Sequence, residues 1–216
     1  MKIDFVSDVS CPWCAIGLNA LEQALARIVP SLPVQLHFQP FELNPQMGAD
    51  GQEIVEHLGQ KYGIDAAQIA ANTEAIRQRG AALGFTFGIG KRSRIYNTFD
   101  AHRLLHWAGL AGDAPQRALK HALLKAYFTD GQDPSDHAVL VQAATQAGLD
   151  ESGARAVLAS HAHAEDVREA QAFYRQQGIQ AVPAVIINDR HLISGGQPVE
   201  VFERALRQIA AETVPG

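Results

Sequence analysis

Two cysteines separated by two residues are the side chains of this chain with the clearest chemistry. Cys11 and Cys14 enclose Pro12 and Trp13, directly after a strand-like run at residues 3–7 and before a helical pattern. A Cys-x-x-Cys pair at the start of a helix places both sulfurs on one side, one turn apart, within the range that a disulfide requires. We therefore expect this pair to open and close as a redox-active disulfide with little backbone motion.

The two sulfurs are expected to have different roles. Cys11 lies at the amino end of the helix, where unpaired amide donors and the helix dipole favour a thiolate, so it is the predicted attacking sulfur. Cys14 lies one turn deeper and is predicted to resolve the mixed disulfide. Pro12 removes a backbone donor beside Cys11, and Trp13 is expected to contact the substrate. The direction of electron flow and the reduction potential do not follow from these residues.

A zinc site is the alternative chemistry for a close cysteine pair. His102 and His106 are four residues apart and could complete a Cys₂His₂ set with Cys11 and Cys14. The intervening sequence lacks zinc-finger spacing, and the helical pattern already accounts for the two histidines. We therefore predict no metal and no bound cofactor other than the cysteine pair itself.

A second feature supports the redox interpretation independently. Val182-Pro183 stands directly before a strand-like run, where a proline cannot donate to a sheet ladder. A cis peptide bond would make this position tolerable, and Pro183 would then limit access to the sulfurs while the Val182 backbone pairs with an extended peptide. An ordinary trans proline at a sheet edge is the alternative.

The remaining pattern indicates how these residues are positioned. Residues 3–7, a helix predicted to end at Pro30 and Pro33, and residues 34–41 form a β-α-β unit. Residues 184–188 and 191–194 then form two strands, and an amphipathic helix follows from about Pro198. This predicts an α/β core of order β-α-β followed by β-β-α, made by residues 1–51 and 178–216 and interrupted by an all-helical insertion at residues 52–177.

Composition excludes several classes of function. The formal net charge is −5 and the pI is about 6.0, which argues against nucleic acid as a partner. Neither a signal peptide nor an apolar run of membrane-spanning length is present, so we expect no membrane association and a cytoplasmic location. Two cysteines exclude a structural disulfide framework. The oligomeric state is not indicated.

Several other residues are expected to have structural roles. The segment Gly88–Arg94 fails the phosphate-loop spacing and is predicted to be a solvated basic loop. His161 and His163 alternate on an expected helix and are predicted to lie at the surface. The following aromatic residues are expected in hydrophobic cores: Tyr62, Phe85, Phe87, Trp107 and Phe173.

The chain resembles the DsbA-like thioredoxin-fold oxidoreductases, specifically the FrnE-like branch. The motifs that carry this resemblance are residues 8–14 (DVSCPWC), 40–45 (PFELNP), 97–104 (NTFDAHRL), 126–128 (AYF), 182–183 (VP) and 194–198 (SGGQP). The resemblance implies a thioredoxin core interrupted by a helical domain. It also implies a nucleophilic Cys11, a resolving Cys14 and a cis Pro183.

Related glutathione-dependent proteins, the kappa-class transferases and the 2-hydroxychromene-2-carboxylate isomerases, carry a serine where this chain has Cys11. In those relatives the segment that matches Ser194, Gly195, Gly196 and Gln197 helps to hold glutathione. The resemblance therefore implies a glutathione site at these four residues and glutathione as a co-substrate. Asn44 and Asn97 also belong to the shared motifs, although turn and cap roles explain them equally well.

Three functions are consistent with these observations. The first is a protein disulfide oxidoreductase or isomerase that acts on thiol-bearing or disulfide-bearing proteins through a mixed disulfide on Cys11. The second is a glutathione-dependent isomerase or transferase of a small organic substrate. The third is a chaperone-like module that binds peptides in a groove between the core and the helical insertion.

Overall fold

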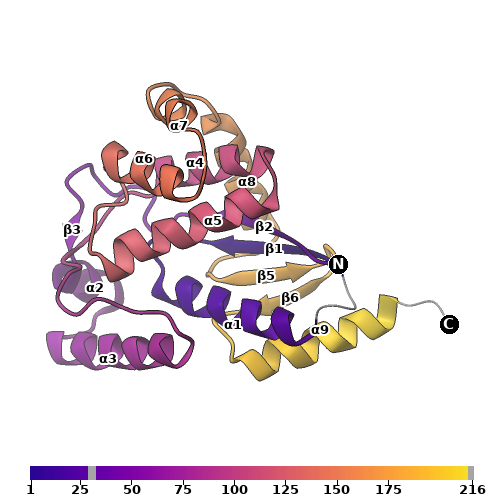
Figure 1. Cartoon of the computed structure of the whole chain (residues 1–216). Helices are drawn as coiled ribbons and strands as arrows, with labels where there is room; N and C mark the ends of the chain where they lie inside the picture. Colours follow the sequence, from indigo (N-terminus) through magenta and orange to yellow (C-terminus); the bar gives the residue numbers. More distant parts are fainter. Residues whose placement is uncertain (29–32, 214–216) are drawn as a thin grey trace.

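The computed structural model describes residues 1–28 and 33–213 and has a four-stranded sheet at its centre (Figure 1). The strands are β1 (Lys2–Ser7), β2 (Gln35–Pro40), β5 (Ala184–Ile187) and β6 (His191–Ser194), in the order β2-β1-β5-β6. β1 is parallel to β2 and antiparallel to β5, which is antiparallel to β6. With the helices that follow β1 and β6, this is the predicted thioredoxin-like order of β-α-β followed by β-β-α.

Helices α1 (Pro12–Ile28) and α9 (Val199–Thr213) lie side by side on one face of the sheet (Figure 1). Alternate residues of β1 point to this face, where Ile3 and Phe5 are fully buried and Phe5 meets the ring of Phe38 edge-on at 5.9 Å. Helix α1 ends at Ile28. Pro30, one of the two prolines expected to end it, lies outside the described residues.

The opposite face of the sheet is covered by helix α8 (Ala164–Gln176). The other residues of β1 point this way, and Val6 packs with Phe41, Tyr174 and Ile179 in a smaller apolar cluster. β1 is buried along its whole length after Lys2 and has apolar residues on both faces, as a central strand requires.

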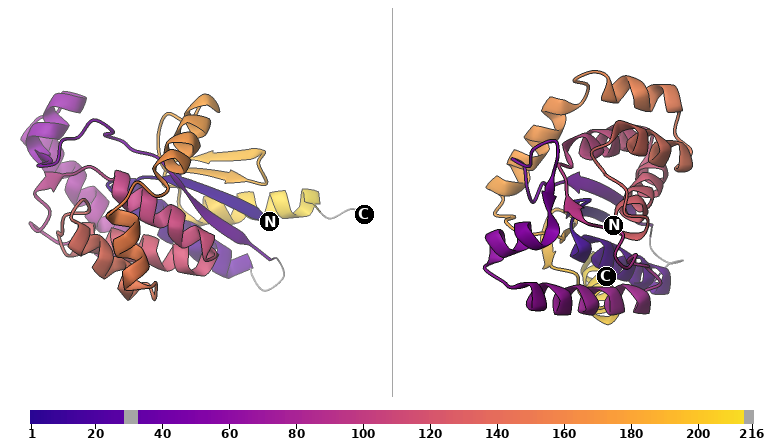
Figure 2. Two further views of the ribbon diagram at one scale, coloured as in Figure 1. Left: turned by 90° about the horizontal axis from the view of Figure 1, so that it is seen from above. Right: turned by 90° about the vertical axis from the view of Figure 1, so that its left-hand side faces the viewer.

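The segment between the two halves of the core is built mainly of helices, and Figure 2 shows them gathered around one end of the sheet. Its elements are β3 (Gln52–Glu53), α2 (Ile54–Tyr62), α3 (Ala66–Ala82), β4 (Arg94–Ile95), α4 (Phe99–Leu110), α5 (Asp113–Leu124), the π-helix η1 (Lys125–Thr129), α6 (His137–Gln146), α7 (Glu151–Leu158) and α8. Helices α4, α5 and α8 all contact β2. The segment therefore packs directly on the sheet, and the division at residues 51 and 177 stays a prediction.

The insertion is not entirely helical, contrary to the prediction. β3 and β4 pair as a short antiparallel ladder, and the Arg94 guanidinium donates hydrogen bonds to the carbonyl oxygens of Asp50 and Gly51. A ladder of two residues is too short to leave an alternating pattern in the sequence, so periodicity could not reveal it.

The aromatic residues expected in the core fall into two groups. Phe85 is buried and packs edge-on against Phe87 and Phe128. Tyr62 and Phe173 are 57% and 53% exposed, so the prediction is wrong for them. Tyr62 is the last residue of α2, and Phe173 is followed one turn later by Gln176, so neither extends a buried apolar stripe.

None of the helices in the described residues combines the length and the apolar character that crossing a lipid bilayer requires.

We expect the core between the sheet and α9 to dominate stability. Phe202 is fully buried in this core, and Phe202→Ala should lower the free energy of unfolding by about 3–5 kcal/mol, because it removes apolar burial and leaves a cavity. Leu110→Ala is the control, since Leu110 is 68% exposed and its loss should cost no more than about 0.5 kcal/mol. Urea unfolding of both variants measures the difference; similar losses would contradict this assignment.

Candidate active site

The cysteine pair lies at the junction of β1 and α1. Cys11 immediately precedes the first helical residue, Pro12, whose missing N–H is not needed at that position. The Cys14 N–H donates to the Cys11 carbonyl oxygen at 3.0 Å, which closes the first turn. Both thiols are free, and Cys11 is 4% exposed whereas Cys14 is fully buried. Cys11 is therefore the outer sulfur and Cys14 the inner one.

The segment Val182-Pro183 lies against this turn although it is far away in sequence. The Val182–Pro183 peptide bond is cis. The Cys11 thiol donates to the Val182 carbonyl oxygen at 3.6 Å, across 171 positions of the chain. Antiparallel pairing of β1 with β5 causes this proximity, because the residues that precede β5 reach the end of β1 where Cys11 lies.

Two glycines, Gly17 and Gly196, allow the segments around the cysteine turn to pack closely. Gly17 was not identified from the sequence. A Cβ atom at Gly17 would lie 3.0 Å from Cγ of Pro183, and one at Gly196 would lie 2.9 Å from the Trp13 carbonyl oxygen. A glycine in a helix interior costs about 0.5–1 kcal/mol relative to alanine, so Gly17 within the α1 pattern was the available signal. Both positions need the small residue for close approach.

The residues predicted to hold glutathione lie beside the same turn. The Gly195 N–H donates to the Pro183 carbonyl oxygen at 2.8 Å, and the Gln197 side chain donates to the Ser194 carbonyl oxygen at 2.7 Å. Gly196 approaches the backbone of Trp13, as described above. The segment Ser194–Gln197 is thus a neighbour of the cysteine turn, and its binding role stays a prediction.

The rim of the site is formed by Trp13 together with helices α2 and α3. The Trp13 side chain is 36% exposed, and the Arg79 guanidinium lies 5.2 Å from its ring. The Lys61 ammonium donates to the Leu43 carbonyl oxygen and to the side-chain oxygen of Asn44. Asn44 therefore has a structural role in anchoring α2 to the loop after β2.

A buried carboxylate lies just before the cysteine turn. Asp8 is 1% exposed and accepts hydrogen bonds from the Ser10 N–H and hydroxyl and from the Leu43 N–H, while the imidazole of His102 lies 3.5 Å away. Burial by itself would raise the pKa of Asp8, but His102 and these amide donors outweigh it and lower that pKa to about 2. Asp8 is thus a permanent anion that shapes the turn.

A buried ammonium group balances this anion. Lys120, on α5, is fully buried, and its Nζ has no hydrogen-bond partner within the described residues. Burial lowers the pKa of Lys120, while the charges of Cys14, Asp8 and Cys11 oppose that shift. Burial likewise raises the pKa of the Cys14 thiol well above its usual range, and Cys11 adds to this, whereas the Lys120 charge lowers it. Sequence reasoning missed Asp8 and Lys120.

A cavity of about 190 Å³ lies between β2 and the helices α4 and α5. Lys120 and His102 line its inner part, and each carries a buried nitrogen without a hydrogen-bond partner in the described part of the chain. His37, His106 and Leu110, which are only partly buried or exposed, also line it. The cavity therefore leads from the surface toward the polar groups beneath the cysteine turn.

The four side chains of the Cys₂His₂ alternative, Cys11, Cys14, His102 and His106, do not form one cluster in the structure. His102 faces Asp8, whereas the nearest acidic partner of His106 is Asp166 at 3.7 Å. Within the described residues, the group of ligand atoms that has metal-binding spacing consists of His106, His163 and Asp166 and includes neither cysteine.

The chain is similar to several known proteins over almost its whole length. The family model for the DSBA-like thioredoxin domain matches residues 2–207. The structure of a probable DsbA oxidoreductase from Streptomyces coelicolor is 35% identical, with a TM-score of 0.92, and the match covers 100% of this chain and 92% of the other. The uncharacterized protein YwbO of Bacillus subtilis is 25% identical over 95% of this chain and 96% of its own length.

A more distant match shows the same fold. The cytosolic disulfide reductase DsbM of Pseudomonas aeruginosa, solved with glutathione, is 17% identical, with a TM-score of 0.65 and coverage of 98% of this chain and 100% of the other.

The Asp8 carboxylate makes a pH-dependent contribution to stability. Its folded-state pKa is lowered from 3.8 to about 2, so this contribution is fully present above pH 4 and is lost as the pH falls toward 2. We expect it to be about 2 kcal/mol near neutral pH and about half of that at pH 3. Urea unfolding of Asp8→Asn should therefore show a larger deficit at pH 7 than at pH 3.

Asp50→Asn is the matched control, since Asp50 is exposed and its stability deficit should not change with pH. An Asp8→Asn deficit that is independent of pH would contradict the assignment of Asp8 as a buried anion.

Proposed function

Because the chain belongs to the family of DSBA-like thioredoxin domains, in which the FrnE-like branch fits it, we propose that it is a thiol–disulfide oxidoreductase with Cys11 as nucleophile and Cys14 as resolving thiol. The contact that carries this proposal is the one between the Cys11 sulfur and the Val182 carbonyl oxygen. The Cys11 sulfur thus lies at the start of α1, next to the loop that contains the cis Pro183 and one helical turn from the Cys14 thiol.

When the chain acts as a reductant, the exchange proceeds in two steps. The Cys11 thiolate attacks one sulfur of a substrate disulfide, forms the mixed disulfide and expels the other substrate sulfur as a thiolate. Cys14 then loses its proton and attacks the Cys11 sulfur, which releases the second substrate thiolate and leaves a Cys11–Cys14 disulfide. Oxidation of a substrate dithiol is the same sequence in reverse.

We infer that polypeptides are the main substrates. The sheet ladder of β5 begins at Ala184, so the backbone of Val182 lies outside it and beside the outer sulfur. An extended peptide could pair with this backbone while its disulfide approaches Cys11. The partly exposed Trp13 and the exposed Tyr62 offer apolar contact area near the same opening.

We also infer that Lys120 assists the resolving step. Cys14 is fully buried, and its raised pKa makes the thiol a poor nucleophile unless a nearby group stabilises the thiolate. Lys120 is the buried cation that interacts with Cys14, and Asp8, Cys11 and His102 are the other titratable groups in its surroundings. The cavity that Lys120 lines offers a route by which a proton can reach solvent.

Glutathione is the small-molecule partner that fits the same site. A groove of about 350 Å³ runs beside the Gly196–Gln197 segment between α1, α3 and α9, and Arg27 and Arg79 line it. The Arg79 guanidinium suits a carboxylate of glutathione, whereas Arg27 already pairs with Glu200 and Glu203. Because DsbM, which has the same fold, is described as cytosolic and was solved with glutathione, we propose a cytoplasmic enzyme that uses glutathione as its thiol partner.

The two cysteine variants should behave differently. Cys14→Ser keeps the attacking sulfur but cannot resolve, so incubation with a disulfide-bonded peptide should leave a covalent peptide adduct on Cys11 that intact-mass spectrometry detects. Cys11→Ser should form no adduct and should lower the rate of insulin reduction by at least about a hundredfold. An adduct on Cys14 in the Cys11→Ser variant at a comparable rate would exclude these roles.

The same variants discriminate the alternatives. Activity on a small organic substrate that survives Cys14→Ser and requires glutathione would favour the isomerase or transferase alternative. Suppression of aggregation that persists after both thiols are alkylated would favour the chaperone-like alternative.

Removal of the buried charge should slow resolution. In Lys120→Met the Cys14 thiolate loses its cation, so the pKa of Cys14 should rise further, and release of the mixed disulfide at pH 7 should slow by about tenfold or more. Raising the pH should restore the rate. Stopped-flow decay of a fluorescent mixed disulfide, measured as a function of pH, reports this shift.

Lys125→Met is the matched control, because Lys125 follows directly after α5 but is exposed and pairs with Asp130. A pH profile of Lys120→Met that coincides with that of the wild type would remove Lys120 from the mechanism, even if the rate at neutral pH had changed.

A further inference from the structure

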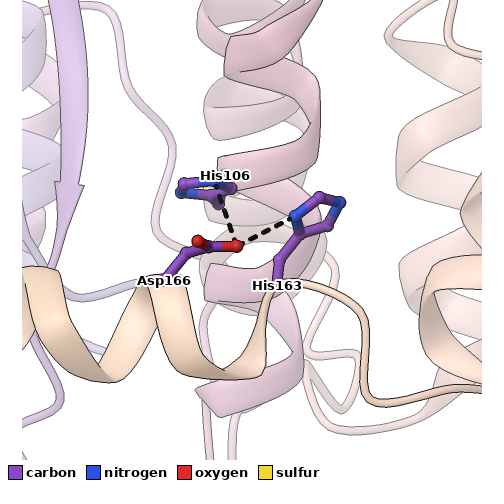
Figure 3. Close-up of side chains that lie close together, drawn as sticks. All are labelled: His106, His163 and Asp166. Carbon is purple, nitrogen blue, oxygen red and sulfur yellow. Dashed lines mark hydrogen bonds and ion pairs between the residues drawn. The ribbon is translucent and has the colours of Figure 1, made fainter.

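A cluster of three potential ligand side chains lies apart from the cysteine pair, between helices α4 and α8. His106 comes from α4, His163 from the turn just before α8, and Asp166 from the first turn of α8 (Figure 3). Figure 3 shows the two imidazole rings and the carboxylate turned toward one another across the gap between the helices. Of the three, His106 also lines the cavity beside Lys120, and none has a chemical role in the disulfide exchange proposed above.

The prediction for His163 from the sequence was wrong. His163 was expected on a helix with its side chain at the surface, but α8 begins at Ala164, so His163 lies in the preceding turn. Its backbone is left-handed, with φ at 61°, and its side chain is 21% exposed. Histidine tolerates this conformation better than most residues. His161, two positions earlier, is exposed as predicted.

The spacing of the ligand atoms is that of a metal site. The Asp166 carboxylate oxygen lies 3.3 Å from Nδ1 of His163 and 3.7 Å from Nε2 of His106. All three atoms lie within 4.8 Å of one another. Zinc–nitrogen and zinc–oxygen bonds of about 2.0–2.2 Å in a tetrahedron separate two ligand atoms by roughly 3.3–3.5 Å. An ion could therefore be accommodated with only small side-chain movements.

Hydrogen bonding accounts for these contacts less well. A nitrogen–oxygen distance of 3.7 Å is beyond hydrogen-bonding range, and 3.3 Å is longer than the usual 2.7–3.2 Å range. Two other histidine–carboxylate pairs of this chain do form short hydrogen bonds, at 2.9 Å between His121 and Glu22 and at 2.8 Å between His137 and Asp100. In the cluster, one carboxylate oxygen makes a long hydrogen bond with His163 at 3.3 Å and lies 3.7 Å from Nε2 of His106, so it stands between two imidazoles at distances that an ion can bridge.

The two imidazole rings also lie near each other. Their centroids are 5.1 Å apart, so both rings can approach one ion between the helices. Neutral imidazole is the form that binds a metal ion.

We propose that His106, His163 and Asp166 bind one divalent transition-metal ion, with Zn²⁺ as the ion that best suits two imidazoles and one carboxylate. Three protein ligands leave a coordination position for water or an external ligand. The ion would link α4 to α8, two helices of the same segment that contact each other and both pack on β2. The site does not depend on the proposed disulfide exchange.

Zinc titration tests this site. The Cys11→Ser/Cys14→Ser double variant prevents binding of the ion by thiolates. After removal of metals with a chelator, isothermal titration calorimetry with Zn²⁺ should show one saturable site per chain. His106→Gln and Asp166→Asn, each in this background, should weaken binding by at least about tenfold because each removes one ligand. Far-UV circular dichroism of the metal-free variants verifies that they are folded.

His161→Gln in the same background is the matched control, since His161 is close in sequence but outside the cluster; its affinity should stay within about twofold of the parent. The proposal is overturned by the absence of saturable binding, by several weak sites per chain that His161→Gln reduces as much as His106→Gln does, or by unchanged affinity in Asp166→Asn. Should His106→Gln fail to fold, His163→Asn replaces it, because asparagine also tolerates the left-handed backbone.

Discussion

The burial of one thiol among charged groups is the constraint on which the rest of the site depends. Cys14 is completely enclosed, so its sulfur can become a thiolate only if the protein supplies a stabilising charge. In the proposed mechanism Lys120 supplies that charge from α5, and Asp8 keeps it from being an isolated buried cation. Isolated buried charges are costly, whereas opposite charges in one pocket partly offset each other's desolvation. The helical insertion thus contributes chemistry to the thioredoxin-like core as well as cover.

Sheet topology explains why residues from three distant parts of the chain meet. The pairing of β1 with β5 brings the cis Pro183 loop to the end of β1, where the cysteine turn begins. The packing of α5 on β2 brings Lys120 beneath that turn from the other side. Gly17 and Gly196 then permit the helix, the proline loop and the segment after β6 to approach within van der Waals distance. Each of these contacts depends on a local feature, such as a strand pairing or a glycine, that does not indicate a functional site by itself.

Local pattern and long-range packing differ in what they reveal from sequence. The cysteine spacing, the alternation in the strands and the position of Pro183 before a strand are local signals. They sufficed to predict the order β-α-β followed by β-β-α, and the resemblance to a known family implied the thioredoxin-like fold that the structure confirms. Lys120 could not be found in this way, because a lysine on an amphipathic helix normally indicates a solvated face. His163 was expected within a helix, but its backbone is left-handed and α8 begins at the next residue, Ala164. The sequence pattern does not show where a single residue leaves the helical conformation. The pairing of β3 with β4 is too short to leave any pattern.

Equilibration in glutathione redox buffers shows whether Cys11 and Cys14 form one reversible couple. Alkylation of the remaining thiols followed by intact-mass measurement counts the oxidised cysteines at each ratio. Both cysteines should oxidise together in a single two-electron transition, with a midpoint between about −270 and −120 mV. Two thiols that persist at every ratio, or two separate glutathione adducts without an internal disulfide, would show that the two cysteines are not such a couple.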